Sequence, residues 1–322
     1  MILTPEVLTI LILDLLLTLF SSIAFIIALK IVFKWDFNAT TQQQYTLEKQ
    51  SYLGSTIIKY TLYLKIILFF FFLFTLDKLS SVINGAMCAA GVVDATSFGI
   101  YLLLFKVLNI YLFGFWLVVH YFDVKHPNLP FTQHKFTFFI LIFFLFLTEI
   151  YLEVSMFASI DIAKLVSCCG TLFSTSENSY VSSLFKINQN YFLIAFYLIF
   201  CILLLLYFMK NSFLYVIFNL LFLVAAVISL ILFFSTYIYE LPTHNCPFCI
   251  LQKEYHYIGY VIYTSLFLGT FYGFCVGIYD MYFKEKLSSE IFFKRSIILN
   301  GFYVGLVSYF VLSYYIRFGL FL

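Results

Sequence analysis

The sequence predicts an all-α fold, a polytopic membrane helix bundle with about eight transmembrane helices. Of its 322 residues, 63% are hydrophobic and only 11% are charged, and the mean hydropathy is +1.02. A water-soluble core does not need this much apolar surface. The net charge is only +2, so the composition gives no indication of a nucleic-acid partner.

Apolar segments follow one another along the chain, and each is long enough to cross about 30 Å of hydrocarbon. We expect spans near 7–33, 56–76, 97–121, 136–158, 191–209, 213–238, 256–280 and 296–318. No basic region precedes the first segment and no small-x-small site follows it, so a retained helix is expected there instead of a signal peptide. We therefore predict one integral membrane domain over 1–322.

Basic residues fall unevenly on the two sets of loops between these spans. One set holds Lys30, Lys34, Lys49, Lys59, Lys125, Lys135, Lys210, Lys284, Lys286, Lys294 and Arg295, and the other holds Lys78, Lys164, Lys186, Lys253 and Arg317. By the positive-inside rule the first set is cytoplasmic, which puts both termini outside. The abundance of Phe (44) and Tyr (26) is typical of an AT-rich genome. We expect a bacterial inner (cytoplasmic) membrane, with membrane lipid as the surroundings of the helices.

The cysteines agree with this orientation. Cys88, Cys168, Cys169, Cys246 and Cys249 fall in the expected periplasmic loops, and Cys201 and Cys275 fall within spans. Disulfides persist on the oxidising side of a membrane. Cys88 and Cys249 are also half a chain apart, and each precedes a similar segment that contains Gly99 or Gly259. A 4+4 duplication with halves 1–190 and 191–322 would explain this similarity, and chance similarity of apolar sequence is the alternative.

The run Cys246-Pro247-Phe248-Cys249 indicates redox chemistry. A disulfide across two residues closes a very short loop and adds little stability, so redox use is favoured over a structural bridge. We expect Cys249 to begin the following helix, where the positive end of the dipole would favour its thiolate. Lys253 would then lie one turn inward, beside that thiolate or a reduced quinone, or would snorkel at the interface.

The run from Cys246 to Lys253, Cys-Pro-Phe-Cys-Ile-Leu-Gln-Lys, resembles the active-site signature of the DsbB-type disulfide-bond formation proteins. The vitamin K epoxide reductase family is similar in its Cys-x-x-Cys pair and its earlier shuttle cysteines. Both families have a four-helix core, and the similarity covers about 10–20 residues of this chain. It implies a thiol:quinone oxidoreductase with quinone as cofactor and a periplasmic thioredoxin-fold or other dithiol protein as electron donor. Lys253, with Gln252 and His256 near it in the sequence, would contact the quinone.

Further cysteines suit a relay. The neighbours Cys168 and Cys169 form only a strained mutual ring, which would be readily reduced. Together with Cys88 they would pass electrons to Cys246. A structural bridge from Cys88 to Cys168 or Cys169 is the alternative.

Two other functions remain open at this point. His244, Cys246, Cys249 and His256 form a set that is chemically adequate for Zn or Cu, which would make the chain a metal-binding or metal-transport membrane protein. A structural subunit of a respiratory assembly, with disulfides in its outer loops, is the other possibility.

Four ionisable residues fall inside expected spans at a similar depth. They are Asp14, Lys106, Glu149 and Glu153. Such residues are functional candidates by default, and quinone reduction consumes protons, so we expect them to be candidates for a proton pathway. A helix-packing ion pair is the alternative.

Overall fold

The computed structural model describes residues 3–36, 41–126, 129–161, 166, 189–282 and 286–322, with backbone only for 281–282 and 286–288. This described part is helical and contains no strand. Eight of its helical segments are long and apolar enough to cross a membrane, with bounds as follows: Pro5–Lys34, Gln42–Ser80, Gly99–Lys125, Thr132–Ser159, Gln189–Met209, Ser212–Tyr239, Ile258–Asp280 and Ser289–Phe318. The predicted all-α bundle of about eight transmembrane helices is therefore confirmed.

The chain divides into two compact units. Unit 1 comprises Met1–Asn84 and Val92–Leu165, and unit 2 comprises Gly85–Gly91 and Val166–Leu322. Each unit contains four membrane-spanning segments. The expected single domain with possible halves, and the internal duplication, stay predictions.

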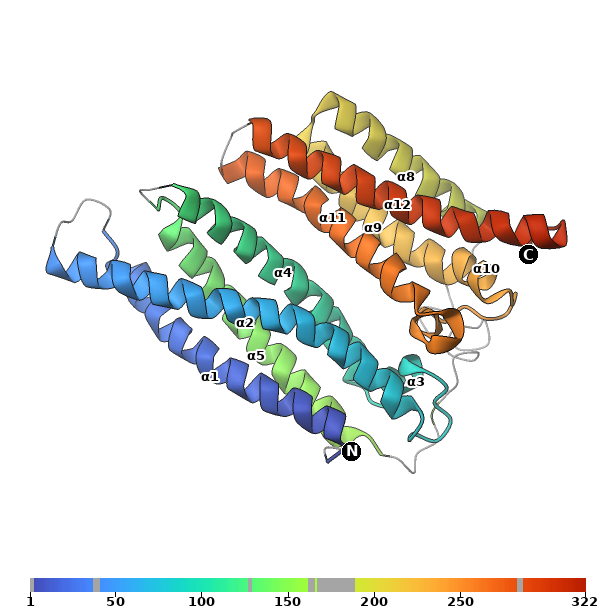
Figure 1. Cartoon of the computed structure of the whole chain (residues 1–322), viewed down its shortest axis with the longest axis horizontal. Coiled ribbons are helices and arrows are strands. Elements are labelled where there is room, and N and C mark those ends of the chain that lie inside the picture. The colour runs from blue at the N-terminus through green and yellow to red at the C-terminus, as the bar shows by residue number, and fades with distance from the viewer. Residues whose placement is uncertain (1–2, 37–40, 127–128, 162–165, 167–188, 283–285) are drawn as a thin grey trace. The chain divides into compact units, whose positions relative to one another are not determined.

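Unit 1 is built from four long helices: α1 (Pro5–Lys34), α2 (Gln42–Ser80), α4 (Gly99–Lys125) and α5 (Thr132–Ser159). α1 packs against α2 and α5, and α4 packs against the same two helices (Figure 1). Proline at the start of α1 loses no hydrogen bond there, and the Thr41 side chain caps α2 by accepting from the amide of Gln44 at 3.3 Å. α2 begins well before its predicted span, because hydropathy detects the apolar stretch and not the polar helical turns that precede it.

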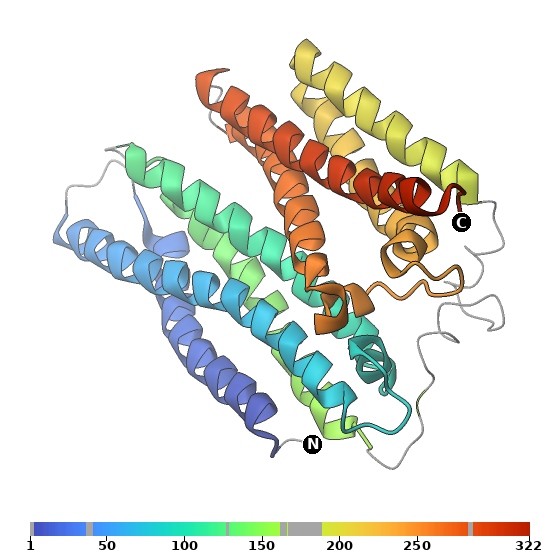
Figure 2. The ribbon, with the colours of Figure 1, turned by 45° about the vertical axis from the view of Figure 1, so that its right-hand side comes forward.

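Unit 2 contains α8 (Gln189–Met209), α9 (Ser212–Ser229), the π turn η1 (Leu230–Phe234), α10 (Ser235–Tyr239), α11 (Ile258–Tyr282) and α12 (Lys286–Phe318). α9, η1 and α10 form one span. α8 packs against α9 and α12, and α11 packs against the same two helices. Figure 2 shows the helices of both units from a second direction.

Buried polar side chains join the helices of unit 2. Asn219 donates to the carbonyl of Thr270 at 2.8 Å, and Ser296 donates to the carbonyl of Gly269 at 2.8 Å. A Cβ atom on Gly273 would lie 2.4 Å from Asn219 Oδ1, so glycine allows α9 and α11 to approach this closely. Small residues and interhelical hydrogen bonds are the usual means of helix association in lipid.

A short helical element precedes each of the two long helices, α4 and α11, that the predicted duplication relates to each other. α3 (Ala89–Asp94) precedes Gly99, and the 3-10 turn η2 (Cys249–Leu251) precedes Gly259. A Cβ atom on Gly99 would lie 2.0 Å from the carbonyl oxygen of Val93, and one on Gly259 would lie 2.7 Å from that of Ile250. In both cases glycine lets a helix begin directly against the backbone of the preceding turn.

Candidate functional site

Three cysteines meet in unit 2. The Sγ atoms of Cys88, Cys246 and Cys249 all lie within 4.8 Å of one another, and the Cys88 and Cys246 sulfurs are 3.5 Å apart. All three side chains are buried. We call this group the cysteine cluster. Of the other predicted relay residues, Cys168 and Cys169 lie outside the described residues.

The backbone after Cys249 differs from the expectation. η2 ends at Leu251, Gln252 is extended with ψ 162°, and a second 3-10 turn, η3, covers Lys253–Tyr255. His256 and the next residue then adopt positive φ values of 53° and 56° before α11 begins at Ile258. These breaks interrupt any continuous α-helix between Cys249 and α11.

Two predictions are therefore wrong. Cys249 does not open the long helix, so the positive end of the α11 dipole lies several residues away from it. Lys253 does not sit one helical turn inward on the same face as Cys249, and its side chain is exposed. His256, expected near the quinone or a metal, is exposed as well.

Two tyrosines fix the backbone of the Cys-x-x-Cys loop. Tyr239, at the end of α10, donates to the carbonyl of Cys246. Tyr263, in the second turn of α11, donates to the carbonyl of Pro247 at 2.6 Å. The loop is thus held from the helix on each side of it. Sequence reasoning missed both residues, because nothing distinguishes them among 26 tyrosines except their places at the ends of spans next to the motif.

The segment that carries Cys88 belongs to the same unit although it follows α2 in the sequence. Gly85 has a φ of +88°, and a Cβ atom on it would lie 2.6 Å from the carbonyl oxygen of Val166. Gln252, which we expected at the quinone, donates its side-chain amide to the carbonyl of Met87 at 3.2 Å. This hydrogen bond ties the 3-10 region to the residue that precedes Cys88.

His244 is half-buried beside the cluster, and its ring packs on that of Tyr239 at 4.5 Å between centroids. Burial lowers the pKa of His244, and nearby Cys88 acts in the opposite direction. Of the metal set predicted from His244, Cys246, Cys249 and His256, only the two cysteines belong to the group that the structure brings together. Within the described residues, the group with metal-ligand spacing is the cysteine cluster, in which Cys88 takes the place of the two histidines.

A second cluster lies in unit 1, where all four predicted intramembrane ionisable residues come together. The contacts are Lys65 Nζ to Asp14 Oδ1 at 2.9 Å and to Glu149 Oε1 at 3.0 Å, and Lys106 Nζ to Glu149 Oε1 at 3.0 Å and to Glu153 Oε2 at 2.8 Å. We call these five residues the ion cluster. They come from α1, α2, α4 and α5 and are all buried.

Sequence reasoning missed Lys65 and a sixth residue, Asn109. Lys65 links Asp14 to Glu149, and Asn109 donates to Glu149 Oε2 at 2.5 Å. A signal for Lys65 was present, because it lies in the middle of the predicted span 56–76. Its ring contact, 4.9 Å from Nζ to the centroid of Phe146, places the ammonium group among aromatic side chains.

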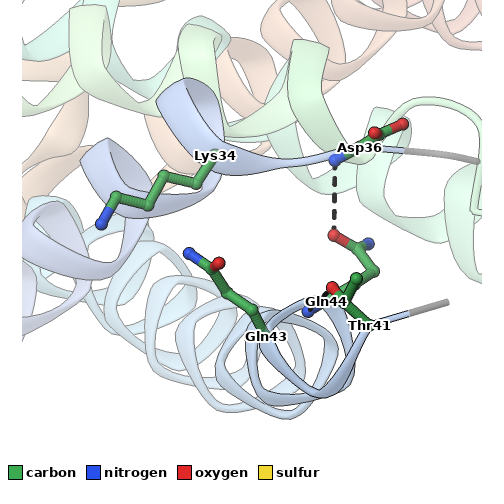
Figure 3. Close-up of a pocket in the computed structure, with 5 residues that line it drawn as sticks. All are labelled: Lys34, Asp36, Thr41, Gln43 and Gln44. Atoms are coloured by element: carbon green, nitrogen blue, oxygen red, sulfur yellow. Dashed lines mark hydrogen bonds between the residues drawn. The ribbon is translucent and has the colours of Figure 1, made fainter. Parts of the chain in front are cut away.

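A polar pocket lies at the turn between α1 and α2 (Figure 3). It is lined by Lys34, Asp36, Thr41, Gln43 and Gln44, and the Asp36 amide donates to Gln44 Oε1 at 3.3 Å. None of the predicted site residues lines it. The chemistry of the chain therefore centres on the cysteine cluster and the ion cluster.

No family model, curated protein sequence or solved structure shows a significant match to this chain. Function has to be inferred from the two clusters. Three cysteine sulfurs at these distances can exchange disulfides or bind a soft metal ion. Buried ionisable side chains in a membrane segment can hold a proton.

Proposed function

We propose that this protein is a membrane thiol:quinone oxidoreductase that passes electrons from dithiol proteins outside the membrane to quinone. The observation that carries the proposal is the position of Cys88 Sγ, 3.5 Å from Cys246 Sγ and within 4.8 Å of Cys249 Sγ. A structural disulfide needs two cysteines, whereas disulfide exchange needs a third sulfur next to the pair. The cluster supplies that third sulfur.

Two thiol–disulfide exchanges and one quinone reduction make up the proposed cycle. With Cys246 and Cys249 joined as a disulfide, the Cys88 thiolate attacks Cys246, forming a Cys88–Cys246 bond and releasing Cys249 as a thiolate. A second relay thiol, expected from Cys168 or Cys169, attacks Cys88 and releases Cys246. The reduced pair then gives two electrons and two protons to quinone, which yields quinol and restores the disulfide. The net reaction converts a relay dithiol and a quinone into a relay disulfide and a quinol.

The surroundings of the pair support this assignment of roles. Cys246 is the exchange residue, because its sulfur lies 3.5 Å from that of Cys88. We assign Cys249 as the residue that faces quinone. It begins η2, and the backbone of that turn lies directly against the first turn of α11 at Gly259. The pair lies in the connection between α10 and α11 of a four-helix unit, and the resembling families carry theirs at the outer end of a helical hairpin in a four-helix core.

The proposed location is a bacterial inner membrane, with the cysteine loops on the periplasmic side. The distribution of basic residues between the loops supports it, and so does the absence of cysteine from the loops expected in the cytoplasm. The electron donor would be a periplasmic protein with a reduced dithiol, of the thioredoxin fold or another.

Quinone reduction by purified protein in detergent, driven by a reduced dithiol donor, tests the proposal. We expect turnover in the wild type, none in Cys249→Ser, and normal turnover in Cys275→Ser. Cys275 is a matched control, because it is buried in α11 outside the cluster. In Cys249→Ser no Cys246–Cys249 disulfide can form, so Cys88 and Cys246 should stay reduced in the presence of the donor, visible by mass spectrometry after alkylation. Undiminished turnover in Cys249→Ser would refute the mechanism.

A soft-metal site is the second candidate, favoured by the same three sulfurs. Around one Zn²⁺ or Cu⁺ ion with metal–sulfur bonds of about 2.3 Å, the sulfurs would be roughly 4 Å apart, which fits the cluster. The soft-metal hypothesis predicts one bound metal ion per chain in the purified protein and loss of that ion in Cys246→Ser. Metal analysis of the wild type, Cys246→Ser and Cys275→Ser distinguishes it from the redox proposal.

A further inference from the structure

The ion cluster is a linear chain of alternating charge. Asp14 contacts Lys65, Lys65 contacts Glu149, Glu149 contacts Lys106, and Lys106 contacts Glu153, each at 2.8–3.0 Å. Both ends of this chain are carboxyl groups. Glu149, in the middle, has both ammonium groups on Oε1 and the Asn109 amide on Oε2, so each of its oxygens is satisfied.

The charges in this chain do not balance. Two ammonium groups face three carboxyl groups, which leaves one negative charge in excess if every group is ionised. The excess charge would be buried, because every member has a relative exposure of 4% or less. Uncompensated charge at such a site is costly, and a carboxyl group there is instead neutralised by a proton. Deprotonating a lysine would only increase the imbalance.

Oxygen atoms without a donor point to the same conclusion. Within the described residues, Asp14 Oδ2, Asn109 Oδ1 and Glu153 Oε1 are buried and have no hydrogen-bond partner. The buried pair of Asp123 and Lys135 in the same unit is different. Asp123 is matched one to one by Lys135, and both its oxygens accept hydrogen bonds, Oδ1 from the Phe131 amide and Oδ2 from Thr132 and Lys135. The carboxyl oxygens without a donor therefore belong to the cluster whose charges do not balance, and not to the balanced pair.

Glu153 is the better of the two end groups for holding a proton. It is fully buried and lies one helical turn from Glu149 on α5, with which it shares Lys106. Like charges at this spacing on one helix repel each other, so neutralising Glu153 removes that repulsion as well as the excess charge. Glu149 cannot take this role, because it alone bridges both lysines.

We propose that the ion cluster binds one exchangeable proton, carried as the carboxylic acid of Glu153. The ligand is H⁺ from water, which adds to the carboxylate and leaves it again without any other reactant. The site lies wholly in unit 1 and does not depend on the proposed redox function. The site is buried among four membrane-spanning helices. Binding of the proton to Glu153 would therefore make the net charge inside this helix bundle depend on the proton concentration.

Infrared difference spectroscopy of the full-length purified protein tests this inference through the carbonyl stretch of a protonated carboxyl group. We expect a band near neutral pH that shifts in D₂O and disappears as the pH is raised. It should also shift with carboxyl-¹³C-labelled glutamate and stay in place with labelled aspartate. The labelling experiment uses the wild-type chain, so it does not depend on the folding of a variant.

Variants identify the residue. In Glu153→Gln two carboxylates face two ammonium groups, so the band should be lost while circular dichroism shows an unchanged fold. Glu254→Gln, in the exposed turn after the cysteine pair, should keep the band. The proposal would be overturned if the wild type showed no band at any pH, or if the band survived in Glu153→Gln. It would also be overturned if Na⁺ removed the band at constant pH, because the cluster would then bind a metal cation in place of the proton.

Discussion

Replacing Lys106 by methionine tests whether the ion cluster holds unit 1 together. Methionine fills similar space without charge, and the change removes two contacts, to Glu149 at 3.0 Å and to Glu153 at 2.8 Å. Asp14 and Glu149 would then share Lys65 alone, and Glu153 would lose its ammonium partner. The 4.4 Å contact of the ammonium group with the ring of Phe72 would be lost as well.

The magnitude follows from the geometry. At an effective dielectric constant of about 20, the contact with the Glu149 carboxylate contributes roughly 6 kcal/mol of attraction, and desolvation of the ions offsets several kcal/mol of this for each ion. The contact with the protonated Glu153 is a hydrogen bond from a charged donor, which contributes roughly 1.5–3 kcal/mol. Removing one partner of a buried pair typically costs about 3–5 kcal/mol, and we expect Lys106→Met to lower the free energy of unfolding by that amount. Adding Glu153→Gln should recover little of the loss, because Glu153 already carries a proton and adds no charge.

Equilibrium unfolding in detergent, followed by circular dichroism, measures this effect. Lys210→Met is the matched control, because Lys210 pairs with Glu290 while its side chain is 64% exposed. An exposed pair contributes less than about 1 kcal/mol. If Lys106→Met costs no more than Lys210→Met, the ion cluster does not stabilise unit 1.

Three further predictions concern the cysteine loop. Gly259→Ala should destabilise the protein by about 1–3 kcal/mol in the same unfolding assay, because its Cβ atom would meet a carbonyl oxygen at 2.7 Å; Gly305→Ala, with nothing within 4 Å, should cost nothing. Tyr263→Phe removes a 2.6 Å hydrogen bond to the Pro247 carbonyl and should cost about 1 kcal/mol, and an unchanged unfolding midpoint would contradict this. Burial keeps the pKa of His244 below its ordinary 6.5, so the unfolded chain binds that proton more tightly. The stability of the wild type should therefore fall as the pH drops below about 6.5, and a pH titration should show a smaller fall in His244→Gln.

The sequence by itself determined the class of the protein and the position of most spans. Transfer of apolar side chains into lipid is a local and nearly additive quantity, so hydropathy along the chain finds the spans without knowledge of their neighbours. The Cys246–Cys249 pair and the four intramembrane ionisable residues were visible for a similar reason. Paired thiols, or charges within an apolar segment, are unusual wherever the segment packs.

Only the tertiary structure decided which of these residues meet. Cys88 reaches the pair across 158 residues of sequence, and its segment is seated through the positive φ of Gly85. Lys65 joins the ion cluster because the packing of α2 turns that side chain toward α1 and α5. The register and rotation of each helix against its neighbours depend on packing between distant residues, which no local pattern records.

The backbone conformation after Cys249 also depends on tertiary packing. The sequence favours a helix from Cys249 onward, yet the chain forms two 3-10 turns and begins α11 at Ile258. Tyr239 and Tyr263 hold the loop in that form through its carbonyl groups. Hydrogen bonds from the two flanking helices override the local preference for a helix here. They form only after those helices have packed together, so the local sequence does not predict them.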